Sequence, residues 1–168
     1  SLGPKCFVAG TPILTTAGKK AIEELRPGDW VLSWDEETGE VIERPVTEWF
    51  QRETSAIVDI FIGIEKISCT TDHPFWVQGQ GWVLAFQLKA GTVLQSREGE
   101  LLVIDAVHCR NEVTQVYNIE IDGLHTYFVS NLEILSHNAC NGRQKPELPA
   151  LDSTGKVHGN LPRPKDLN

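Results

Sequence analysis

The stretch TQVYNIEIDGLHTYFVSNLEILSHN, residues 114–138, decides how this 168-residue chain folds. Its Val, Ile, Tyr and Phe residues alternate with polar ones, and Asp122-Gly123 interrupts the alternation with a turn signal. Aromatic and β-branched residues at a period of two indicate half-buried strands. The stretch therefore predicts two or three β-strands, the last of which ends at His137-Asn138.

The preceding residues repeat this alternating pattern. Residues 29–49, DWVLSWDEETGEVIERPVTEW, predict a hairpin with its turn at Thr38-Gly39, and residues 92–107 predict a second one. Only residues 19–25 and 84–90 indicate a helical turn, and both segments are short. Many brief strands at this spacing predict an all-β fold with very short helices.

Composition divides the chain into a body and two flanks. With 40% hydrophobic and 23% charged residues, it can bury one core. Residues 139–168 contain four of the nine prolines and no aromatic residue, so they cannot bury enough surface to fold and should form a flexible flank. We therefore expect a single domain over residues 6–138, preceded by residues 1–5 as the remnant of an upstream polypeptide.

Charge and hydropathy argue against two classes of partner. The net charge is −8, and the five basic and three acidic residues of 139–168 leave −10 on residues 1–138. An acidic body of this size disfavours nonspecific binding to nucleic acid. No stretch is apolar enough to cross a membrane, and residues 1–10 lack the layout of a secretory signal. We expect a monomer that binds neither nucleic acid nor membrane.

The cysteines and acidic residues give no sign of a metal or cofactor. Cysteines occur at positions 6, 69, 109 and 140 without a C-x-x-C pair, and SWDEETGE, residues 33–40, lacks the ligand spacing of a calcium loop. Cys69 and Cys109 lie in strand-like runs, so both are predicted to be buried thiols. Pro45 and Pro74 are predicted at strand ends or edges, because proline cannot donate a backbone hydrogen bond.

Four separate motifs follow one another along residues 6–138. CFVAGTPI begins at Cys6 and is followed by RPGDWVLS, TTDHPF spans 70–75, VYNIEIDGLHTYFV spans 116–129, and His137-Asn138 closes the series. In this order they resemble the Hint superfamily, which comprises inteins, bacterial intein-like domains and the autoprocessing domain of Hedgehog proteins. The resemblance implies a horseshoe of β-strands whose chain ends lie close together. It also implies a site made of the residues Cys6, Thr70, His73, Asn118, His125, His137 and Asn138.

The chemistry of the first junction can be reasoned from the residues themselves. A cysteine thiolate at position 6 can attack the carbonyl carbon of Lys5 and form a thioester. His73 is suited to protonate the departing amine. The Thr70 hydroxyl can hydrogen-bond the developing oxyanion or hold the imidazole. The sequence thus predicts an N–S acyl shift at Lys5-Cys6, carried out once by a cysteine nucleophile.

The second junction suits a different reaction. The side-chain amide of Asn138 can attack its own backbone carbonyl, close a succinimide and expel Ala139. An amide is a poor nucleophile and an amine is a poor leaving group, so an acid–base group such as His137 is needed to accelerate this step. His125 matches a family position that assists asparagine cyclisation.

Two departures from the intein pattern favour cleavage over splicing. A splicing intein is followed at once by Cys, Ser or Thr, but Ala139 offers no acceptor and Cys140 stands one residue too late. Asn118 stands where inteins often carry aspartate, and asparagine can act neither as a base nor as a charge beside Cys6. The resemblance therefore implies independent cleavage at both junctions, as in bacterial intein-like domains.

The sequence leaves two alternatives open. In the first, an external thiol or amine intercepts the thioester, as in Hedgehog proteins. Asn138 argues against this alternative, because that class needs no C-terminal cyclisation. In the second, the chain is an inactive metal-binding β-module. The partners expected for the leading hypothesis are the chain's own flanking polypeptides in cis. Residues 153–168 resemble the junction before the effector domain of bacterial toxins with a pretoxin Hint domain. We therefore expect a larger secreted or surface precursor, with the compartment unassigned.

Overall fold

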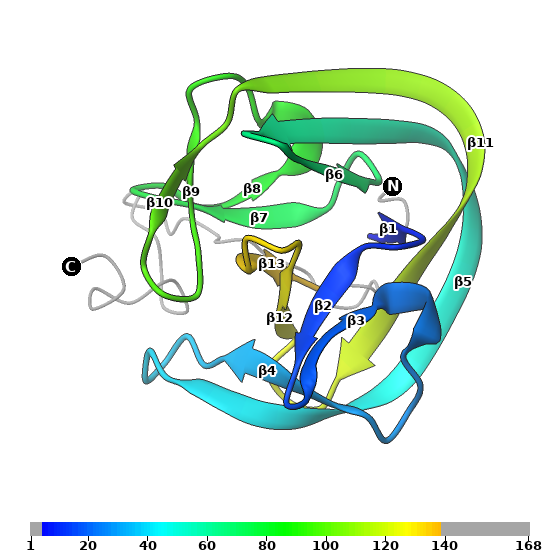
Figure 1. Ribbon diagram of the computed structural model, residues 1–168, viewed down its shortest axis with the longest axis vertical. Helices are drawn as coiled ribbons and strands as arrows, with labels where there is room; N and C mark the ends of the chain where they lie inside the picture. The colour runs from blue at the N-terminus through cyan, green and yellow to red at the C-terminus, as the bar shows by residue number, and fades with distance from the viewer. Residues whose placement is uncertain (1–4, 139–168) are drawn as a thin grey trace, which may run out of the picture.

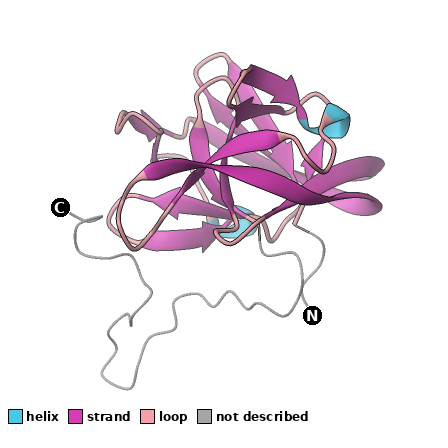
Figure 2. Cartoon of the chain, turned by 90° about the horizontal axis from the view of Figure 1, so that it is seen from below, coloured by secondary structure: helices cyan, strands magenta, loops and turns pink. Residues whose placement is uncertain are grey.

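The computed structural model describes residues 5–138, and strands make up most of them, with two short helical turns (Figure 2). The strands and 3-10 turns are, in chain order, β1 (Phe7–Val8), β2 (Pro12–Thr15), β3 (Gly18–Ala21), η1 (Ile22–Glu24), β4 (Trp30–Trp34), β5 (Val41–Ile62), β6 (Glu65–Cys69), β7 (Pro74–Val77), β8 (Gly81–Leu84), η2 (Ala85–Gln87), β9 (Val93–Gln95), β10 (Leu101–Val103), β11 (Ala106–Ile121), β12 (Thr126–Val129) and β13 (Ile134–His137). The all-β prediction is confirmed. No helix within residues 5–138 has the length and apolar character that a membrane crossing requires.

The long strands β5 and β11 give the molecule its curved outline. They pair antiparallel almost throughout their lengths and run side by side around one edge, with β12 and β13 near the centre (Figure 1). The strand order is β10-β9-β7-β13-β12-β2-β4-β5-β11-β1-β6, and β5 also pairs with β6. This order brings the first and last strands of residues 5–138 into one continuous sheet.

Strand β1 is short but central to the arrangement of the site. Phe7 pairs with Tyr117 of β11 on one side and with Cys69 of β6 on the other. Its side chain is fully buried and packs edge-on against Phe75 and Tyr127. Burial of a phenylalanine contributes roughly 1.5–3 kcal/mol, so Phe7 holds the beginning of the domain in the core.

Several local predictions agree with the structure. The hairpin of residues 29–49 is β4 and β5, the second hairpin is β9 and β10, and residues 114–138 contribute the end of β11 with β12 and β13. Gly39 has a φ of 78°, which glycine adopts without strain, and its N–H donates to the Asp35 carbonyl in the first turn. The two predicted helical turns are the three-residue η1 and η2.

Three predictions differ from the structure. The strands are not all brief, because β5 exchanges its partner β4 for β11 near Pro45 and continues. Pro74 does begin a strand, whereas Pro45 lies inside β5 at this exchange of partners. Cys69 is buried as predicted, but Cys109 is exposed. Strand β1 pairs with β11 only at Val116 and Tyr117, so it does not cover Cys109.

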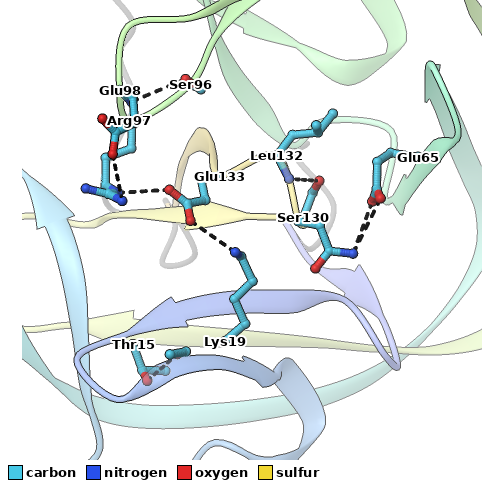
Figure 3. A network of polar contacts seen from close by, with 11 residues as sticks. Thr15, Lys19, Glu65, Ser96, Arg97, Glu98, Ser130, Leu132 and Glu133 are labelled. Carbon is cyan, nitrogen blue, oxygen red and sulfur yellow. Dashed lines mark hydrogen bonds and ion pairs between the residues drawn. The ribbon is translucent and has the colours of Figure 1, made fainter.

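A polar network fixes the turn between β12 and β13. Glu133 accepts a hydrogen bond of 2.9 Å from Arg97 and lies 3.0 Å from the Lys19 ammonium (Figure 3). These contacts outweigh partial burial and lower the pKa of Glu133. In the same turn, Ser130 accepts the Leu132 N–H. The network ties β13, which ends at His137, to the β2–β3 hairpin and to the β9–β10 turn.

Candidate functional site

The backbone of Cys6 is held by Thr70 from two directions. Thr70 Oγ1 accepts the Cys6 N–H at 3.0 Å, and the Thr70 N–H donates to the Cys6 carbonyl at 3.0 Å. Both residues are buried, with exposed fractions of 1% and 2%. Thr70 follows β6 directly, and β6 pairs with β1, so the sheet itself sets this contact. The hydroxyl therefore contacts the nitrogen that would leave in an acyl shift from Lys5.

His73 lies at the end of the same turn, in an apolar environment. It is completely buried, and its ring centroid lies 4.1 Å from that of Phe7 and 5.5 Å from that of Phe75. Neither ring nitrogen has a hydrogen-bond partner among residues 5–138. Burial, and next the positive charge of Lys5, hold the pKa of His73 well below its usual value. The imidazole is therefore neutral at pH 7, with one nitrogen available to accept a proton.

Lys5, the residue before Cys6, is also buried. Only 3% of its surface is exposed, and its Nζ lies 3.5 Å from Asp72 Oδ2. Asp72 lies within the turn between Thr70 and His73 and is 6% exposed. Both residues flanking the Lys5-Cys6 bond thus contact the same four-residue turn.

His137, at the end of β13, packs against an aromatic ring. Its centroid lies 4.9 Å from that of Trp82 on β8 and 6.4 Å from that of His125. Burial, and next the neighbouring His125 and Lys5, lower the pKa of His137 to about 3. His137 is therefore also neutral near pH 7. The charge of Lys5 acts on both His73 and His137, so the two junctions share one electrostatic environment.

Asn138 is fully buried and held by two hydrogen bonds. Its N–H donates to the His125 carbonyl at 2.7 Å, and its Nδ2 donates to the Ile119 carbonyl at 2.5 Å. His125 adopts a left-handed φ of 64°, which non-glycine residues rarely adopt. Its Nδ1 lies 3.1 Å from Glu120 Oε2. Strained residues of this kind often occur at functional sites.

Asn118 connects the two junctions through β11. Its Oδ1 accepts the Tyr127 hydroxyl and the Ile119 N–H, each at 2.8 Å, whereas its Nδ2 has no partner among residues 5–138. The preceding Tyr117 pairs with Phe7, and the following Ile119 binds Asn138. The stretch 117–119 therefore lies between the beginning and the end of the domain.

The structure thus brings the predicted site residues into two connected groups. Cys6, Thr70 and His73 surround the first junction, and His125, His137 and Asn138 surround the second, with Asn118 between them. Ala139, Cys140 and the flank 139–168 lie outside the described residues. Sequence reasoning missed Asp72 and Tyr127, although both stand within quoted motifs. Within residues 5–138, no three His, Cys, Asp or Glu side chains are grouped so that they could bind a metal ion.

One known protein family matches most of the chain. The pretoxin HINT domain family matches residues 12–139, about three quarters of the sequence. The chain belongs to this family. The HINT domain is therefore a self-processing domain, and its substrate is the polypeptide that contains it. None of the curated proteins matches it significantly.

Solved structures agree with this assignment. The HINT domain is similar to the bacterial intein-like domain from Clostridium thermocellum, with 41% identity and a TM-score of 0.77 over 81% of this chain and 100% of that one. The gp41-1 intein is 26% identical, with a TM-score of 0.65 over 79% and 98%. The DnaX mini intein from Spirulina platensis has the same fold at 22% identity, with a TM-score of 0.68 over 79% and 99%. The horseshoe fold expected from the motifs is confirmed.

Proposed function

We propose that the HINT domain cleaves its own chain at Lys5-Cys6 through a thioester. The Cys6 sulfur forms a bond to the carbonyl carbon of Lys5, and the bond from that carbon to the Cys6 nitrogen breaks. The thiol loses one proton and the Cys6 amine gains one, so the step needs no further reactant. The contact between Thr70 and the Cys6 N–H supports this proposal, because it holds the nitrogen that leaves.

His73 would carry the proton between the two atoms. A neutral imidazole can accept the proton of the thiol, and the resulting imidazolium can donate it to the departing amine. The lowered pKa of His73 favours this order, since the residue starts without the proton. Burial also makes the imidazolium short-lived, so transfer to the more basic amine should follow readily.

Cleavage at Asn138-Ala139 would occur by asparagine cyclisation. The Nδ2 atom bonds to the carbonyl carbon of Asn138, the bond to the Ala139 nitrogen breaks, and one proton passes from the amide to that nitrogen. The neutral His137 ring is suited to transfer this proton. The hydrogen bond from Nδ2 to Ile119 restricts the side chain beforehand, which reduces the entropy lost on ring closure.

Separate cleavage would dominate over splicing. Ala139 has a methyl group and cannot accept the acyl chain from the Cys6 thioester. The thioester is then open to water or to a small external thiol or amine. Asn118 adds no negative charge between the two junctions, so the cleavages need not be coordinated.

The observation that carries this proposal is the set of contacts at the two ends of the domain. Thr70 binds the Cys6 N–H, His73 packs against the adjacent Phe7, and Asn138 Nδ2 binds the Ile119 carbonyl of β11. The test is a fusion with a reporter protein at each end, incubated with and without a small thiol. We expect Cys6→Ala to abolish thiol-dependent release at Lys5 and to preserve release at Asn138. Asn138→Ala should do the reverse. Equal release from both variants and the wild type would disprove the proposed roles.

A further inference from the structure

The buried position of Lys5 is unusual for its residue type. Lysine is almost never fully buried without a charge partner, because removing the ammonium from water is costly. Here 3% of Lys5 is exposed, and its Nζ lies 3.5 Å from Asp72 Oδ2. Lys5 belongs to the polypeptide that would be released, whereas Asp72 belongs to the domain. The domain therefore presents a buried carboxylate to the residue before the scissile bond.

The Asp72 carboxylate can accept more hydrogen bonds than Lys5 donates to it. Its Oδ1 is buried and has no hydrogen-bond partner within residues 5–138. A carboxylate buried with one oxygen unsatisfied favours any donor that can reach both oxygens. Arginine supplies two parallel N–H groups for such a contact, and lysine supplies one point of charge. A neutral or acidic side chain would leave Asp72 buried and without a counter-charge.

The same turn fixes both sides of the Lys5-Cys6 bond. Thr70 holds the Cys6 nitrogen at 3.0 Å, and Asp72, two residues later, holds the Lys5 side chain. His73, which follows Asp72, lies against Phe7. Binding the preceding side chain would therefore restrict the scissile carbonyl beside the groups proposed to act on it. Restricting a reacting group in this way raises the rate of an intramolecular step.

We infer that Asp72 is a specificity-determining residue that binds the cationic side chain preceding the scissile bond, so that the domain selects lysine or arginine there. This inference rests on the proposed cleavage at Lys5-Cys6. It defines the substrate as a polypeptide segment that ends in a basic residue. Asp72 acts on the substrate side chain and not on the reacting atoms.

The test measures thiol-induced release at Cys6 in reporter fusions of the full chain. Lys5→Arg should retain at least about a third of the wild-type rate, whereas Lys5→Gln should lose about tenfold or more, as expected for the loss of one hydrogen bond between charged groups. Lys5→Glu should be slower still, because two carboxylates would meet in a buried site. In the Asp72→Asn background, the difference between Lys5 and Lys5→Gln should shrink to within about threefold.

A second arm needs no cleavage. In the Cys6→Ala background, a double-mutant cycle of Lys5→Gln and Asp72→Asn in urea unfolding should give a favourable coupling between the two residues. Additive effects there would overturn the inference, and so would equal cleavage rates for the wild type and Lys5→Gln. If the coupling is present but no chain releases the segment ending at Lys5, the proposed cleavage is disproved. The selection of a basic residue for cleavage is then disproved too, whereas the contact between Lys5 and Asp72 stands. Because the coupling is measured without cleavage, an absent contact between Lys5 and Asp72 can be told apart from an absent cleavage at Lys5-Cys6.

Discussion

The hydroxyl oxygen of Thr70 lies 3.0 Å from the backbone nitrogen of Cys6 and accepts its N–H. An amide nitrogen is a poor leaving group until it is protonated, and its lone pair must first lose conjugation with the Lys5 carbonyl. A fixed hydrogen bond at this nitrogen holds it in one orientation relative to that carbonyl. Thr70 is therefore positioned to assist one step of the proposed reaction, the departure of the Cys6 nitrogen from the Lys5 carbonyl.

Replacing Thr70 should slow the first cleavage selectively. Thr70→Val keeps the shape of the side chain but removes the acceptor for the Cys6 N–H. We expect thiol-induced release at Lys5 to fall by about tenfold to a hundredfold, since a positioned polar group contributes on this scale. Release at Asn138 should change little. Time courses analysed by mass spectrometry give both rates, and Thr71→Val is the matched control. Equal losses at both junctions would indicate a general folding defect.

His125→Gly should separate stability from function. Glycine adopts the φ of 64° without strain, so the turn and its carbonyl contact with Asn138 should be retained. We expect the free energy of unfolding to change by less than about 1 kcal/mol, because relief of strain offsets the loss of the half-exposed contact with Glu120. Cleavage at Asn138 should slow by about tenfold or more if the imidazole assists cyclisation. Urea unfolding and cleavage rates measured on the same protein provide the comparison, and an unchanged rate would remove His125 from the site.

Stability should fall on mild acidification. His137 has a pKa of about 3 in the folded state, and that of His73 is also lowered, whereas both take up a proton near pH 6.5 when unfolded. The unfolded state then binds more protons, so stability is fully present above pH 6.5 and is lost as the pH falls toward 3. Each histidine contributes up to about 1.4 kcal/mol per pH unit in that interval.

Chemical unfolding between pH 7 and pH 4.5 measures this slope. His137→Gln should reduce it, whereas Glu133→Gln should leave the slope in this interval nearly unchanged, because the lowered pKa of Glu133 places its titration below this pH range. A wild-type stability that stays constant from pH 7 to pH 5 would show that neither histidine is held neutral by the fold.

Ala139→Cys should convert cleavage partly into splicing. A thiol at position 139 can accept the acyl chain from Cys6 within one molecule, where effective molarities can reach about 10⁵ M. Water, at about 55 M, then competes poorly if the alignment is good. We expect an increased ligated fraction on a denaturing gel of the double-reporter fusion, and Asn138→Ala should still block the downstream cleavage. Abundant ligation from the unaltered sequence would mean that Cys140 or the freed amine is already an efficient acceptor.

Alternation and turn residues were sufficient to predict much of the fold. The period of two in residues 114–138 predicts the strands of which the last ends at His137, and Thr38-Gly39 predicts the first hairpin. The lengths of β5 and β11 were not predictable in this way, because a strand that changes partner carries no local signal at the change. The exposure of Cys109 differs from the prediction for a related reason: alternation shows which residues share a face of a strand but not which neighbouring strand covers that face.

Only part of the candidate site could be predicted from the sequence. Cys6, His73 and Asn138 could be proposed as site residues from the four motifs that resemble the Hint superfamily, together with the reactivity of their side chains. The contact between Lys5 and Asp72 could not be predicted, since a lysine beside a cleavage point has no pattern that reveals its burial. One hydrogen bond of Asn118 also depends on Tyr127, nine residues away on β12. Strand β12 pairs with β2 and β13, and β11 pairs with β1 and β5, so tertiary packing sets this contact.

Intact-mass spectrometry of the purified chain, followed over days with and without a small thiol, detects both proposed cleavages in one experiment. With the thiol, the wild type should give three products: a segment ending at Lys5 that carries the thiol as a thioester, a body of residues 6–138, and a fragment that begins at Ala139. The body should first appear one water lighter than the hydrolysed form, because it ends in a succinimide. Cys6→Ala should lose the first product and Asn138→Ala the third. A chain that stays intact under all conditions would disprove both proposed cleavages, and a thioester adduct formed by Cys6→Ala would disprove the role of Cys6 as the nucleophile.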